Sequence, residues 1–119
     1  MKRTGPTNSV LRKLIIDLNK LSRKEKVSLW KVISNELNKP TRKRREVNLY
    51  KIDQYTREGE TALIPGKVLS EGSLNKKLTV AAYKFSKEAK DKINKIGKAV
   101  TIQQLMKENP KAKKIRILG

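Results

Sequence analysis

The residues of this sequence best suited to chemistry are basic, and they are densest in KPTRKRREVNL, residues 39–49. The cations that precede the first acid of this segment, Glu46, are Lys39, Arg42, Lys43, Arg44 and Arg45. Three of them are arginines, whose planar guanidinium binds phosphate through paired hydrogen bonds and stacks on bases. Because such a run repels itself in the free protein, we expect it to contact a polyanion. A solvated loop and a nuclear-import signal are the alternative interpretations.

The charge of the whole chain also favours a polyanionic partner. The 119 residues include 30 Lys and Arg against 11 Asp and Glu, a net charge of +19. Residues 1–58 contain 16 cations and 6 acids, and residues 59–119 contain 14 and 5, so both halves are basic. A charge of this size attracts polyanions at long range. We therefore expect a body embedded among many RNA phosphates, not a single face that reads one groove.

Other basic residues are weaker candidates for RNA contact. Lys2 and Arg3 lie in a basic lead that suits an arm ordering on a phosphate surface. The remaining candidates, two of them at an expected hairpin tip, are Lys67, Lys76, Lys77, Lys113, Lys114 and Arg116. The lysines around the helix expected near residues 87–96 are explained equally well as a solvated face.

Enzymatic chemistry finds little support in the composition. The sequence has no His and no Cys, which removes imidazole bases, thiolate nucleophiles, disulfides and the usual zinc sites. The acids are scattered singly, and Gly66–Lys67 lacks the spacing of a triphosphate-binding loop. We expect no catalytic residue, cofactor, metal or small-molecule substrate. A nuclease that binds metal through separated acids is the remaining enzymatic alternative.

The chain also lacks the sequence features of a secreted or membrane-spanning protein. Its basic start, MKRTGPTNS, has no apolar core of a signal peptide, and no apolar run approaches the ~20 residues of a spanning helix. We expect a cytoplasmic protein. A membrane surface is a weaker alternative partner, because no strongly basic amphipathic helix carries bulky exposed apolar residues.

Apolar spacing predicts two helices at the start of the chain. The first stripe consists of Val10, Leu11, Leu14, Ile15 and Leu18. The second consists of Leu29, Trp30, Ile33 and Leu37. Ser28 is the expected N-cap of the second helix, with Val27 and Val32 at the spacing of a hydrophobic staple. Pro40 ends this helix, because the residue before a proline is disfavoured in helical conformation.

A third, shorter helix is predicted to begin at Asn48. Val47 and Ile52 repeat the staple spacing, and Leu49, Ile52 and Tyr55 supply its buried side. The basic segment would then connect two helices and hold its side chains on a rigid base.

The second half of the sequence alternates strand and helix signals. Residues 60–86 read as short β segments broken by turns at Pro65–Gly66, Gly72 and residues 75–77. Ser86 is the expected cap of a helix that buries residues 89, 93 and 96 and stops at Gly97. Thr101-x-x-Gln104 has the pattern of a capping box.

A terminal strand is expected over residues 114–118. The fold class is therefore mixed α/β in a single domain, residues 1–119. Within it we expect a flexible basic arm over residues 1–7, a helical part over about 8–58 and a β/α part over about 60–119.

An ordered set of short segments resembles the archaeal and eukaryotic large-subunit ribosomal protein eighteen-e family, a relative of the C-terminal domain of bacterial large-subunit ribosomal protein fifteen. The matching segments cover about 100 residues and are Lys39–Pro40, Glu46–Leu49, Ile52, Tyr55, Pro65–Leu69, Gly72, Thr79–Ala82, Phe85–Ser86, Lys92–Ile93, Gly97 and Ala99–Val100. Against the family pattern, residues 42–45 are denser in Arg and Lys.

The resemblance implies a structural role on large-subunit rRNA, among neighbouring ribosomal proteins and without catalysis or cofactor. It also implies a helical N-terminal part followed by an irregular β-β-α superhelix. No homo-oligomer is expected. A free-standing basic DNA-binding or chromatin-like protein is the alternative function.

Overall fold

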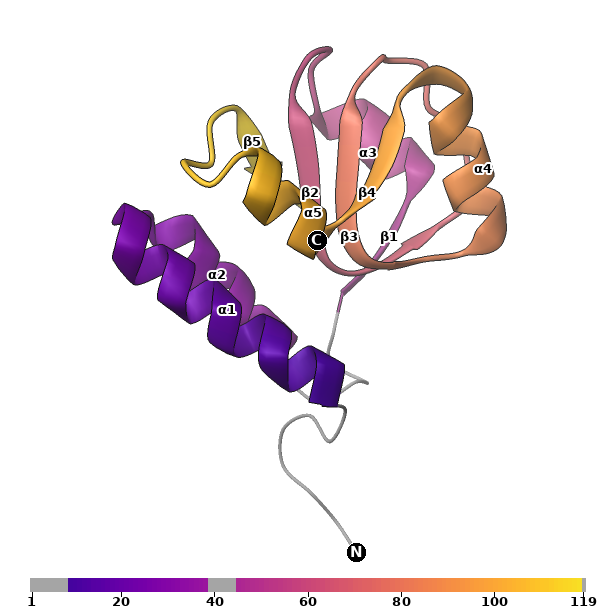
Figure 1. The fold of residues 1–119 in the computed structure, drawn as a ribbon. Coiled ribbons are helices and arrows are strands. Elements are labelled where there is room, and N and C mark those ends of the chain that lie inside the picture. The colour runs from indigo at the N-terminus through magenta and orange to yellow at the C-terminus, as the bar shows by residue number, and fades with distance from the viewer. Residues whose placement is uncertain (1–8, 39–44, 119) are drawn as a thin grey trace, which may run out of the picture.

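The structure, a computed structural model, describes residues 9–38 and 45–118. The first of these ranges contains two amphipathic helices. They are α1 (Ser9–Glu25) and α2 (Ser28–Leu37), joined by a short turn in which Lys26 has a positive φ of 58° (Figure 1). Most of the predicted apolar stripes are buried, including Leu14, Leu18 and the fully buried Trp30. Val10 is the exception, because it lies at the edge of its stripe and is 62% exposed.

The start of α2 differs from the predicted cap. Val27 occupies the N-cap position, and no side chain caps the helix there. Val32 is largely exposed, so the predicted staple does not close over it. The turn is instead held by Ser22, whose hydroxyl donates to the Val27 carbonyl at 2.8 Å.

In the described residues, five parallel strands form one sheet. The strands are β1 (Arg45–Asn48), β2 (Thr61–Leu69), β3 (Thr79–Phe85), β4 (Lys98–Thr101) and β5 (Ile115–Ile117). Their order is β1-β2-β3-β4, and β5 pairs with β2. β3 pairs along one edge of β2, and two strands share the other edge. β1 pairs with the carboxyl-terminal half of β2, and β5 pairs with the amino-terminal half of β2.

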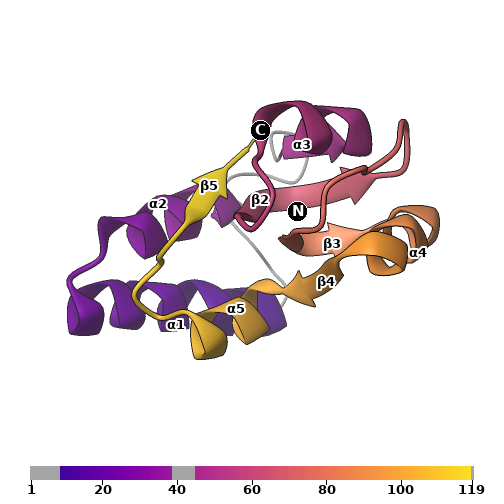
Figure 2. The same ribbon diagram turned by 90° about the horizontal axis from the view of Figure 1, so that it is seen from above.

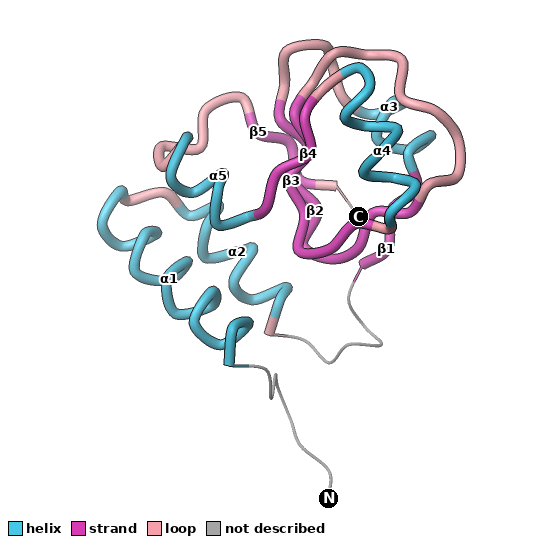
Figure 3. The backbone as a smooth tube through the Cα atoms, turned by 45° about the vertical axis from the view of Figure 1, so that its right-hand side comes forward, coloured by secondary structure: helices cyan, strands magenta, loops and turns pink. Residues whose placement is uncertain are grey.

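Helices cover both faces of this sheet (Figure 3). The helices that follow strands are α3 (Leu49–Tyr55), α4 (Lys87–Ile96) and α5 (Ile102–Glu108). One core cluster packs α3 and α4 against Ala62, Ile64 and Val80. The other packs α1, α2 and α5 against Leu63, Ala81 and Val100 on the opposite face. The alternation of side chains along each strand thus supplies two cores from one sheet.

The strand pairing corrects three expectations. Residues 76 and 77 are not at a hairpin tip, because β2 and β3 are parallel and residues 70–78 connect them. Pro65–Gly66 does not end a strand: β2 continues through it, with a register shift between Ile64 and Lys67. The basic segment does not run directly into a helix either, because β1 intervenes and α3 begins at Leu49.

Two predicted burials are also wrong. Tyr55 is 52% exposed at the last turn of α3, and Ile96 is 37% exposed at the last residue of α4. Each lies at a helix end, beyond the residues that reach the sheet.

Other local predictions are confirmed. The hydroxyl of Ser86 accepts from the Ala89 amide at 3.2 Å and caps α4. That of Thr101 accepts from the Gln104 amide at 3.1 Å and caps α5. A terminal strand is present as β5. Among the described residues, no helix is both long enough and apolar enough to cross a membrane.

Candidate nucleic-acid interface

The parallel sheet places the predicted basic residues at two opposite ends. Lys67 lies near the carboxyl end of β2, beside the beginning of β1. Lys77, Lys113 and Lys114 lie by the amino end of β2, in the segments that precede β3 and β5. The fold therefore separates the candidates instead of gathering them in one site.

At the first end, three strands align charged side chains in one row. Lys67 pairs in register with Glu46 on β1 and with Lys84 on β3. The following row, Val68 and Phe85, belongs to the core beneath α3 and α4. Because successive side chains point to opposite faces, Lys67 projects from the other face, and Lys84 is its register partner on β3. Both are exposed, and like charges on neighbouring strands repel each other.

Lys84 also lies at this end, although the sequence groups it with the lysines around the helix at residues 87–96, which a solvated face explains equally well. Its ammonium nitrogen lies 5.6 Å from the centre of the Tyr83 ring, within the range of a cation–π contact. The signal that points to it is strand register, which pairs it with Lys67 and which the sequence alone does not supply.

The basic segment joins the sheet at this same end. Arg45 is the first residue of β1 and pairs with Gly66, one position before Lys67. The predicted contacts that precede it, together with those of the N-terminal arm, lie outside the described residues: Lys2, Arg3, Lys39, Arg42, Lys43 and Arg44. The described chain therefore resumes at Arg45, the last cation of the basic segment, beside Lys67.

At the second end, backbone hydrogen bonds hold two basic loops against β2. The Thr61 amide donates to the Lys114 carbonyl at 2.9 Å, and the Gly59 amide donates to the Lys77 carbonyl at 3.2 Å. The side-chain amide of Asn109 also bonds the Lys113 backbone in both directions, at 2.8 and 3.1 Å. The side chains of Lys77, Lys113 and Lys114 are exposed.

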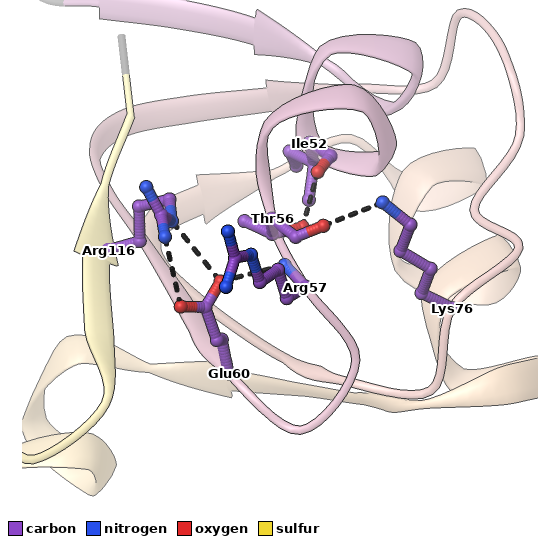
Figure 4. A network of polar contacts seen from close by, with 6 residues as sticks. All are labelled: Ile52, Thr56, Arg57, Glu60, Lys76 and Arg116. Carbon is purple, nitrogen blue, oxygen red and sulfur yellow. Dashed lines mark hydrogen bonds and ion pairs between the residues drawn. The ribbon is translucent and has the colours of Figure 1, made fainter.

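Arg116, at the same end, is engaged within the protein (Figure 4). Its Nε and Nη2 donate to the two carboxylate oxygens of Glu60, both at 3.1 Å, and the Arg57 amide donates to Glu60 Oε1 at 2.7 Å. The hydrogen bond from the Arg116 side chain has the largest effect and lowers the pKa of Glu60, and the hydrogen bond from the Arg57 amide lowers this pKa further. The same pair raises the pKa of Arg116. The guanidinium keeps only part of its donor capacity for a ligand.

Lys76 is also bound within the fold. Its ammonium donates to the carbonyl of Thr56 at 2.7 Å, at the end of α3 (Figure 4). It also donates to the carbonyl of Asp53 at 2.6 Å. A cation placed there satisfies carbonyls that have no partner within the helix. Lys92 is used similarly, since its ammonium donates to the carbonyls of Ser70 and Gly72 at 3.0 and 3.2 Å.

The acids of the described part of the chain form no metal-binding cluster. No three of its His, Cys, Asp or Glu residues lie together as they would around a metal ion. The arrangement suits binding of negative charge at two places on a rigid sheet.

Comparison with known proteins identifies the family. The family model described as "Ribosomal protein 60S L18 and 50S L18e" matches residues 1–119. The chain is 45% identical to "Large ribosomal subunit protein eL18" of Methanococcus maripaludis, over 100% of both chains. It is 44% identical to the protein of that name from Methanopyrus kandleri, over 97% of this chain and 95% of the relative.

The similarity extends to a third archaeal relative of the same name, from Sulfurisphaera tokodaii. That protein is 43% identical, over 98% of this chain and 96% of its own length. A family model that matches from the first to the last residue, together with relatives of similar length, leaves no segment of this sequence unaccounted for. The chain belongs to the family of ribosomal proteins 60S L18 and 50S L18e.

Proposed function

We propose that this chain is a structural, non-enzymatic constituent of the large ribosomal subunit, and that it holds two segments of rRNA at opposite ends of its sheet. Membership of a ribosomal protein family supports the first part. The observation that carries the second is the separation of exposed lysines, with Lys67 and Lys84 at one end and Lys77, Lys113 and Lys114 at the other. Its place is the cytoplasmic ribosome, among rRNA and other large-subunit proteins.

The distance between the two ends supports the proposal that they act on separate phosphates. Thr61 and Lys67 are six residues apart along β2, which at ~3.3 Å per residue is roughly 20 Å. The Debye length at physiological salt is about 8 Å, so the charges of one end are largely screened from the other. Each end therefore attracts its own stretch of backbone, and a rigid sheet between them fixes their spacing.

The contacts at each end differ in strength. Arg45 lies at the Lys67 end, and together with Arg42, Lys43 and Arg44 it is the principal clamp in this proposal, with Lys39 as a further contact. Lys76 and Arg116 are the weakest of the predicted contacts, because their charged groups already bind Thr56 and Glu60. Lys2 and Arg3 remain predicted contacts of an N-terminal arm.

Two finer features of the fold belong to the same proposal. The order strand, strand, helix over β2, β3 and α4 fits one turn of the expected β-β-α superhelix. The division into a helical part up to residue 58 and a β/α part from residue 60 is the second feature, except that β1, within the first part, joins the sheet.

Salt-dependent binding to large-subunit rRNA tests the proposal. The paired change Lys67→Gln and Lys84→Gln removes two phosphate contacts, so the slope of log affinity against log salt should become shallower by about 1.5. Lys87→Gln with Lys95→Gln on α4 is the matched control with the same charge change and should leave more of the affinity. Equal losses for both pairs would mean that only net charge matters.

A second variant addresses the basic segment. Changing Arg42, Arg44 and Arg45 together to Ala should weaken rRNA association and flatten the salt slope, while the melting temperature stays the same or rises. Unchanged assembly and RNA footprints would refute the clamp. A free-standing DNA-binding role, the alternative, predicts a nucleoid pool with no protein on large subunits in sedimentation.

A further inference from the structure

A groove lies between α1 and α5, and its lining includes none of the predicted RNA contacts. It measures about 590 Å³ and is lined by Lys13, Asp17, Lys20, Leu21, Lys24, Gln103, Met106 and Lys107. Figure 2 shows the two helices lying alongside each other, with α5 following β4. The sequence did not single out this place, because its residues come from two segments about 80 positions apart.

The rim of the groove is cationic. Four lysines and one aspartate line it, and Lys13 pairs with Asp17 at 3.6 Å. Lys20, Lys24 and Lys107 are exposed. Lys20 and Lys24 are four residues apart on one helix, a spacing at which like charges destabilise the helix. An anion seated between these ammonium groups relieves that repulsion.

The floor of the groove is apolar. Leu21 and Met106 are half-buried and pack against the core cluster beneath α1, α2 and α5. A ligand that is only an anion gains nothing from this floor. The thioether of Met106 is polarizable and suits contact with an aromatic ring. The Gln103 amide beside it offers a donor and an acceptor to a polar ring edge.

We infer that the α1–α5 groove binds one unpaired nucleotide of the RNA, with its base on Leu21 and Met106 and its phosphates at Lys20, Lys24 and Lys107. This inference rests on the proposed function. An unpaired nucleotide combines a flat, largely apolar base with adjacent negative charge, which are the two features that the groove complements. A base held in a duplex presents its edge, not its face, and cannot lie on this floor.

The methyl group of Met106 reports directly on base insertion. The sequence contains two methionines, so a protein labelled with ¹³C at the methionine methyl gives a simple spectrum, in which Met106→Leu identifies the Met106 signal. Single-stranded tetra-adenylate should shift this signal upfield, because a base ring stacked on the methyl shields it. Tripolyphosphate, which has charge but no ring, should leave it within the general salt effect.

Variants then separate the rim from overall charge. Lys20→Gln, Lys24→Gln and Lys107→Gln together should weaken tetra-adenylate binding at Met106 by at least about tenfold at low salt. The control is Lys87→Gln, Lys90→Gln and Lys95→Gln on α4, which removes equal charge elsewhere and should weaken it less than threefold. All six lysines are exposed, so folding is not at risk.

Three results would overturn the inference. The first is a Met106 methyl signal that does not move with tetra-adenylate. The second is an equal shift of this signal with tripolyphosphate or with a duplex of the same length. The third is a shift produced only by an acidic, leucine-containing peptide, which would mark a protein-docking groove. If rRNA binding still depends on Lys67 and Lys84 in these cases, the groove assignment fails alone. If the protein does not bind large-subunit rRNA at all, the proposed function fails instead.

Discussion

Lys76 and Lys77 are neighbours in the chain, but the fold uses them differently. The Lys76 ammonium caps the end of α3 through two carbonyls, whereas the Lys77 side chain is exposed. Lys76→Ala should therefore lower the free energy of unfolding by about 1–2 kcal/mol, since the hydrogen bonds of a charged group are lost. Lys77→Ala should change it by less than about 0.5 kcal/mol. Urea denaturation measures both, and equal effects would contradict the capping role.

Glu60 should make stability depend on pH. Its pKa is lowered from 4.5 by the hydrogen bond from Arg116 and then by that from the Arg57 amide. The folded state thus holds this proton less tightly than the unfolded state, so the contribution is complete above the unfolded pKa and is lost as pH falls through the folded pKa.

The comparison of wild type with Glu60→Gln isolates that contribution. The difference in melting temperature should be constant from pH 7 to about 5.5, shrink below 4.5, and vanish in stronger acid. Arg116→Gln should reproduce the pattern. A difference that stays constant down to pH 2.5 would show that the ion pair does not stabilise the fold.

At the level of elements, the junction between α4 and β4 tolerates less change than the turn before β2. A Cβ added at Gly97 would lie 2.1 Å from the Leu78 carbonyl oxygen, a backbone atom that already accepts from the Lys98 amide. At Gly59, φ is +88° but a Cβ would meet nothing within 4 Å.

Gly97→Ala should therefore lower the free energy of unfolding by about 3 kcal/mol or more, because α4 or β4 must shift. Gly59→Ala should cost only about 1–2 kcal/mol, from its positive φ. Guanidinium denaturation of both variants measures the difference. If Gly59→Ala proves as damaging as Gly97→Ala, close packing at the α4–β4 junction is not what limits substitution.

Elements whose signals are local could be predicted from the sequence, and those defined by pairing could not. The caps at Ser86 and Thr101 depend on residues three positions away and were predicted correctly. β1 has only four residues, and its partner lies about twenty positions later, so nothing nearby marks it as a strand. For the same reason the sequence singles out Lys67 as a candidate RNA contact but not its register partner Lys84.

For the molecule as a whole, a net charge of +19 means that the free protein is destabilised by self-repulsion. The melting temperature should therefore rise when sodium chloride is increased from 50 to 500 mM, because salt screens the repulsion. Calorimetry measures this. A variant with ten surface lysines changed to Gln should show a smaller rise, and a wild-type melting temperature that falls with added salt would contradict the account.

Crosslinking within assembled large subunits tests the central claim most directly. A photo-crosslinking residue at position 67 and another at position 113 would each be mapped to rRNA at nucleotide resolution. We predict that the two positions crosslink to different rRNA segments, each single and reproducible. Crosslinks from both positions to one continuous stretch, or none to large-subunit rRNA, would contradict a protein that holds two segments at opposite ends of its sheet.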